Sequence, residues 1–161
     1  MTAPAQFRNL DVVLRSSSNL SALVEYLDER VFVISDQEYE GQFILVLELA
    51  EQVQEAQLCT QQFLTIIDAL PDAAMDVWRA CTSRTFSYGF DGGADHPALD
   101  TTISADLLRR IARIDADIGI TVYPFRQSQA LHRYEALSSG SDSEDGFMPV
   151  GTIRVGPAAD G

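Results

Sequence analysis

The residue types that most often carry chemistry gather in one short stretch, FDGGADH, at residues 90–96. It holds Asp91, Asp95 and His96 beside two glycines. A calcium loop places oxygen ligands at alternating positions, as in D-x-D-x-D-G, and this stretch lacks that spacing. The stretch DSEDG at 142–146 also lacks the register and the downstream glutamate of such a loop. We therefore predict a glycine-rich hairpin turn at 90–96 and no metal site in either stretch.

Signatures of nucleophilic catalysis are also missing. A hydrolytic triad needs a histidine beside a serine or cysteine nucleophile and an acid. The chain has two histidines, His96 and His132, and no G-x-S-x-G elbow. Its two cysteines, Cys59 and Cys81, show no C-x-x-C or Cys/His spacing and fall on apolar faces of expected helices, which indicates buried thiols. We predict that the chain is not an enzyme and binds neither a metal nor a cofactor.

Composition narrows the classes of partner. The chain carries 24 acidic and 11 basic residues, a formal net charge of -13, and every base is arginine. Without lysine it has no Walker A loop, Schiff-base lysine or pyridoxal-phosphate site. Direct binding to nucleic acid needs a basic surface, which this charge disfavours. No apolar run approaches the roughly 20 residues that cross a bilayer, and residues 1–13 do not resemble a signal peptide, so we expect a cytoplasmic protein without membrane contact.

The acidic residues are unevenly distributed. No basic residue lies between Arg30 and Arg79. This interval is open to two interpretations: a solvated acidic face that keeps the protein soluble, or a docking surface that attracts a basic partner. Its acids are Asp36, Glu38, Glu40, Glu48, Glu51, Glu55, Asp68, Asp72 and Asp76.

Hydrophobic periodicity predicts the elements that position these residues. Apolar residues alternate with period two in the expected strands and recur at i, i+3 and i+4 in the expected helices. DQEYEG, residues 36–41, is predicted as a turn, and Trp78 as a core anchor. The expected strands are 9–15, 31–35, 42–50, 84–90, 98–103 and 118–123, and the expected helices are 20–27, 51–70, 71–81 and one that begins after Ser104.

This order of elements predicts an α+β fold, a single-domain mixed or antiparallel sheet with helices packed on one face. Residues 9–90 fit a ferredoxin-like β-α-β-β-α-β unit, and a terminal β-α-β extends the same sheet. We expect the domain to span residues 1–125. A C-terminal extension, 126–161, is expected to hold a polar loop at about 138–146 and a short edge strand in VGTIRVG.

The helix after Ser104 carries three arginines, Arg109, Arg110 and Arg113. They lie opposite a predicted buried stripe, and Asp106 can pair with Arg110 at i, i+4. One interpretation is that these arginines form a solvated face whose positive charge balances the acidic interval between Arg30 and Arg79. The other is that they bind an anion or a carboxylate. The predicted stripe consists of Leu107, Leu108, Ile111 and Ala112.

Residues 96–125 resemble the C-terminal part of an uncharacterised bacterial family, domain of unknown function four-two-seven-nine. Matching features are a Pro-Ala-Leu strand start at 97–99, a helix with Ile111 and Ala112 in its core, and an alternating strand from Asp117 to Tyr123. The match covers about a fifth of the chain and consists of framework residues. The resemblance implies a small cytosolic α+β protein of the kind that acts as an immunity protein in bacterial toxin systems.

Our leading hypothesis is an acidic protein-binding module, an immunity-type inhibitor that neutralises a cognate toxin with a basic surface. Asp36, Glu38, Tyr39 and Glu40 are its predicted partner-binding residues, because they combine negative charge with an aromatic anchor. One alternative is an acidic mimic of nucleic acid that inhibits a defence complex, which would bind unrelated basic proteins in a salt-sensitive way. Another is a small-molecule-binding domain, which would require a pocket with convergent polar groups.

Overall fold

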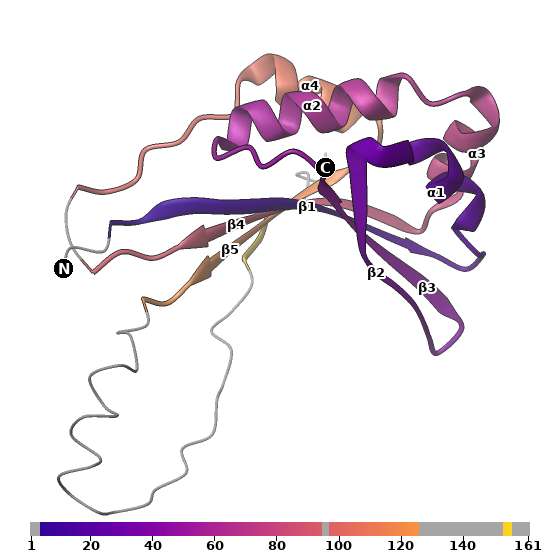
Figure 1. The fold of residues 1–161 in the computed structure, drawn as a ribbon, viewed down its shortest axis with the longest axis horizontal. Helices are drawn as coiled ribbons and strands as arrows, with labels where there is room; N and C mark the ends of the chain where they lie inside the picture. The colour runs from indigo at the N-terminus through magenta and orange to yellow at the C-terminus, as the bar shows by residue number, and fades with distance from the viewer. Residues whose placement is uncertain (1–3, 95–96, 126–152, 156–161) are drawn as a thin grey trace, which may run out of the picture.

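A computed structural model describes residues 4–94, 97–125 and 153–155 (Figure 1). Its strands are β1 (Gln6–Ser16), β2 (Val31–Tyr39), β3 (Gln42–Leu49), β4 (Ser83–Asp91), β5 (Asp117–Tyr123) and β6 (Ile153–Val155). Its helices are α1 (Ser21–Leu27), the short 3-10 turn η1 (Asp28–Arg30), α2 (Ala56–Asp68), α3 (Asp72–Ala80) and α4 (Ala105–Arg113).

The strands form one mixed sheet in the order β2-β3-β1-β4-β5-β6. All neighbouring strands are antiparallel except β4 and β5, which are parallel. The order β2-β3-β1-β4 is the split arrangement of a ferredoxin-like unit, and β4-α4-β5 is the added β-α-β. The helices α1 to α4 cover one face of this sheet (Figure 1). The predicted α+β fold class is therefore confirmed.

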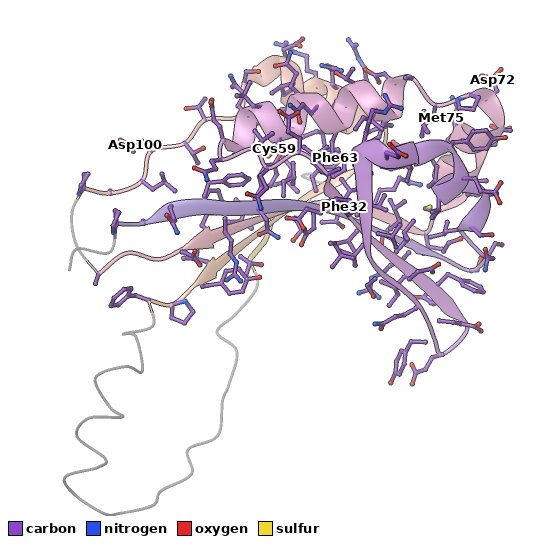
Figure 2. The ribbon with its side chains drawn as sticks, in the orientation of Figure 1. Phe32, Cys59, Phe63, Asp72, Met75 and Asp100 are labelled. Atoms are coloured by element: carbon purple, nitrogen blue, oxygen red, sulfur yellow. The ribbon has the colours of Figure 1, made fainter. Side chains whose placement is uncertain are left out.

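The core lies between the sheet and the helices. Alternate residues of β1 and β4 are buried against α2, as the period of two in a strand requires. Figure 2 shows Cys59 and Phe63 on the side of α2 that faces the sheet. Trp78 of α3 is buried, and its indole Nε1–H donates to the Ile114 carbonyl at 3.1 Å. Trp78 is thus the core anchor that the sequence predicted.

The predicted strand at 98–103 is wrong, since these residues form an irregular connection that leads to α4. An antiparallel return beside β4 is not possible, because β1 and β5 already occupy its two sides. The connection instead crosses over to the helical face, so that β5 can run parallel to β4. The predicted helix at 51–70 is also shorter than expected, because residues 50–55 cross from the end of β3 to the start of α2.

The arginine-bearing helix, α4, buries a narrower stripe than predicted. Leu107 and Ile111 are buried, but Leu108 is 42% exposed and Ala112 is exposed. The Arg110 guanidinium donates to the Asp68 carboxylate of α2 at 2.7 Å, so the predicted pairing with Asp106 is wrong. The arginine on this face therefore ties α4 to α2.

Part of the C-terminal prediction lies outside the described residues. The predicted edge strand is confirmed as β6, which pairs with β5 through Ile153 and Val155. The structure does not describe the predicted polar loop at 138–146 or His132. It also does not describe two residues of the predicted glycine-rich turn, Asp95 and His96. The division at residue 125 stays a prediction.

Candidate functional site

The four predicted partner-binding residues lie in the β2–β3 hairpin. Its loop consists of two residues, Glu40 and Gly41, with φ of 51° and 76°. Two successive residues at positive φ are typical of the tight hairpin turn whose twist matches that of the flanking strands. Because the turn is this short, the prediction of a turn over 36–41 is wrong for its first four residues, which continue β2 to Tyr39.

This extension of β2 places the four residues on different faces. All four are exposed, and the Tyr39 side chain is 65% exposed. Asp36 and Glu38 lie opposite Leu45 and Phe43, on the face that the helices cover elsewhere. Strand alternation puts Tyr39 on the opposite face, and Glu40 sits in the turn. The structure therefore brings the four residues to one edge of the sheet but not to one face of it.

Three exposed apolar side chains of β2 accompany these acids, and the sequence did not predict them as part of the site. Phe32, Val33 and Ile34 are 57%, 43% and 55% exposed. The register with β3 shifts between Val33 and Ser35, so Ile34 is the extra residue of a β-bulge. Figure 2 labels Phe32 on β2. The signal in the sequence is the run of four apolar residues in VFVIS, but such a run is equally typical of a buried strand.

The outer edge of β2 has no partner strand within the described part of the chain, because β2 is the first strand in the order. An exposed edge is a template for pairing with another chain, and proteins commonly protect it with charges and bulges. Here Asp36 and Glu38 supply charge and Ile34 supplies a bulge. We call the set Phe32, Val33, Ile34, Asp36, Glu38, Tyr39 and Glu40 the β2 edge surface.

The acids of the β2 edge surface are not neutralised by the described residues. Ion pairs elsewhere join Arg8 to Asp91 and Arg79 to Asp76, besides the pair of Arg110 with Asp68. None of these pairs includes Asp36, Glu38 or Glu40. The surface therefore presents uncompensated negative charge beside exposed apolar side chains.

Titratable groups beneath α2 belong to the core. Thr60 Oγ1 lies 2.7 Å from both the Ala56 carbonyl and Tyr88 Oη. A carbonyl only accepts, so Thr60 donates to Ala56 and Tyr88 donates to Thr60. Burial raises the pKa of Tyr88 to about 12 and, with Glu48 and Glu55 nearby, that of Cys59 to about 11. Buried, satisfied and protonated, these groups are structural.

The raised pKa of Tyr88 predicts a loss of stability in alkali. The folded pKa of about 12 exceeds the ordinary value of 10.0, so the unfolded chain loses this proton first as the pH rises. The contribution of Tyr88 to the free energy of unfolding is therefore complete below pH 10 and is lost as the pH rises to 12. The expected loss is about 2–3 kcal/mol. Urea unfolding at several pH values should show this slope in a variant that carries Cys59→Ala and Cys81→Ala, because burial raises the pKa of both thiols as well. Adding Tyr88→Phe to that variant should abolish the slope. Tyr39→Phe, at an exposed site, is the matched control and should keep the slope.

An open pocket of about 570 Å³ lies between α2, the η1 turn and the end of β3. Leu49, Leu58 and Ile66 form its apolar part, and Glu29 and Glu51 line it with carboxylates. Its volume falls in the range of small-molecule sites, roughly 300–1,000 Å³. Lining side chains of Leu58 and Gln61 are exposed, so the pocket is open to solvent rather than an enclosed site.

Among residues 4–94, 97–125 and 153–155, no three histidine, cysteine or acidic side chains are grouped to hold a metal ion. No helix in the same ranges has the length and apolar character needed to cross a membrane. The chain matches no model of a protein family, no curated protein and no solved structure.

Proposed function

We propose that this chain is a protein-binding module whose β2 edge surface docks a partner with a basic surface. The observation that carries the proposal is a combination on the outermost described strand and its turn: exposed Phe32, Val33 and Ile34 lie beside three acids that no described residue neutralises. Apolar side chains supply area that the partner can bury, and aromatic residues are the most frequent energetic anchors of interfaces. The free strand edge adds main-chain hydrogen bonds to this contact.

Charge selects the partner. The net charge of -13 attracts basic proteins over long range and repels acidic ones. At the hairpin, Asp36, Glu38 and Glu40 then discriminate between basic surfaces by local complementarity. A second copy of this chain is disfavoured, because association would bring two strongly acidic molecules together.

The particular role that we propose is that of an immunity-type inhibitor acting in the cytoplasm on a cognate bacterial toxin. Many toxins that cut or bind nucleic acids have basic clefts, since they must attract phosphates. An acidic hairpin with an aromatic residue near its tip, Tyr39, suits insertion into such a cleft.

Co-expression tests the proposal. We expect the chain to form a complex with the product of the gene adjacent to its own and to relieve that product's toxicity. The triple variant D36N/E38Q/E40Q should weaken the complex about tenfold or more at low salt, because it removes three interfacial charges. The variant E25Q/D72N, which removes exposed acids from α1 and α3, should leave the affinity unchanged.

Three outcomes would contradict the proposal. They are the absence of a complex, a complex that forms without relief of toxicity, and equal weakening by both sets of variants. Equal, salt-sensitive binding to unrelated basic proteins such as histones would instead favour a mimic of nucleic acid.

A further inference from the structure

The first half of β1 lacks a strand on one side. β1 runs from Gln6 to Ser16, but β3 pairs with it only from Asp11 onward. Residues 6–10 pair with β4 alone, and no other described backbone group bonds to them. Figure 1 shows this half of β1 extending beyond the β2–β3 hairpin. A strand position in line with β3 is therefore vacant beside Gln6–Leu10.

The vacancy arises because β3 ends early. After Leu49 the chain leaves the sheet and crosses to α2 through residues 50–55. None of these crossing residues forms a backbone hydrogen bond with Gln6–Leu10. β1 itself continues as a strand through this region because β4 supports it on the other side, with Arg8 as the extra residue of a bulge.

Two hollows line the vacant edge. One of about 320 Å³ lies between Arg8–Leu10 and residues 50–54, and one of about 400 Å³ lies between Gln6–Arg8, Gln54–Ala56 and Leu99–Thr101. Both are lined by Arg8 and Gln54, so they follow one another along the strand. Space for an added chain is thus present along the same five residues whose backbone edge is free.

The charge around this groove is negative. Glu48, Glu51, Glu55 and Asp100 line the hollows, and none forms an ion pair with another described residue. Figure 2 labels Asp100 in the segment before α4. The basic side chain, Arg8, already contacts Asp91 at 3.5 Å and stacks over Tyr123 at 4.8 Å. An occupant of the groove therefore meets four carboxylates.

We propose that the free edge of β1 at Gln6–Leu10 is a second docking site, which takes an extended basic peptide segment by strand addition. Main-chain hydrogen bonds to β1 would hold the segment, as in other cases of β-augmentation. Side chains of arginine or lysine would meet Glu48 and Glu51 in the first hollow and Glu55 and Asp100 in the second. The site shares one lining residue, Phe32, with the β2 edge surface. Its backbone edge and its carboxylates are separate from that surface, so the two proposals are tested by different variants.

A peptide titration of the full chain tests this site. The probe is a seven-residue peptide of alternating arginine and threonine, acetylated and amidated at its ends. We expect binding that slows hydrogen exchange at amides within Gln6–Leu10. The variant E48Q/E51Q/E55Q should weaken the affinity about tenfold at low salt, and D36N/E38Q/E40Q should change it less than about twofold.

A second peptide separates strand addition from general attraction of charge. It has the same sequence with alternate backbone nitrogens methylated, which keeps the charge and removes N–H donors. Weak binding of the methylated peptide supports the proposal, and equal binding of both peptides overturns it. The proposal is also overturned if the first peptide does not bind, if both sets of variants weaken it equally, or if the amides of Gln6–Leu10 that face away from β4 are already protected before peptide is added.

Discussion

Replacing Trp78 with alanine should lower the free energy of unfolding by about 3–5 kcal/mol, the usual cost of removing a large buried aromatic side chain. Trp78 is 2% exposed and is among the largest fully buried side chains of the described chain. It links α3 to the turn that follows α4 through its hydrogen bond to Ile114. Because domains are typically stable by only about 5–15 kcal/mol, this loss is a large share of the total.

Urea unfolding followed by far-ultraviolet circular dichroism measures this loss, since Trp78 is the chain's one tryptophan and its fluorescence disappears with the substitution. Trp78→Phe keeps most of the buried area but leaves the Ile114 carbonyl unpaired, which should cost about 1–3 kcal/mol. Leu108→Ala, on the exposed side of α4, is the control and should cost less than about 1 kcal/mol. Equal losses for Trp78→Ala and Leu108→Ala would contradict the assigned core.

Replacing Arg84 with methionine should cost about 2–3 kcal/mol, although Arg84 forms no ion pair with an acid in the described part of the chain. Its Nε donates to the Asp115 carbonyl at 2.9 Å, and its Nη1 lies 2.8–3.2 Å from the carbonyls of Cys81, Trp78 and Arg79. These last three carbonyls lie at the C-terminal end of α3, where a positive charge is favourable. The single guanidinium therefore joins α3, β4 and the turn at Asp115, which has φ of 51°.

Arg84→Lys should recover only part of this loss, because one ammonium group cannot reproduce the planar fork of the guanidinium. Arg79→Met is the matched control: its partner is Asp76, and the two side chains are 67% and 74% exposed. An exposed pair of this kind contributes about 0.5 kcal/mol or less. Thermal unfolding that shows equal destabilisation at positions 79 and 84 would count against the role assigned to Arg84.

Local patterns predicted most of the fold. The alternation of Phe86, Tyr88 and Phe90 identified the core face of β4, and the order of elements identified the ferredoxin-like unit and the added β-α-β. The failures concern pairing between distant segments. Residues 98–103 contain Thr101, Thr102 and Ile103, which favour strands, but no free side of β4 is left for them.

The candidate site was less accessible from the sequence. The absence of bases between Arg30 and Arg79 located the acidic region, and the hairpin does carry Asp36, Glu38, Tyr39 and Glu40. Their distribution over two faces depends on the two-residue turn and the resulting length of β2. That Phe32 and Ile34 are exposed depends on β2 being an edge strand, and the vacancy beside β1 depends on where β3 ends. Local residue patterns predict neither which strand lies at the edge of the sheet nor where β3 ends, because both depend on how distant strands pair.

Hydrogen exchange of the complex tests most directly whether a basic partner docks on the β2 edge surface. The full chain is compared alone and bound to the co-expressed product of its neighbouring gene. We predict slower exchange of outer-edge amides within residues 32–39, because these are the unpaired groups that a partner strand would bond. Unchanged exchange there, with protection confined to other elements in the same complex, would contradict the claim.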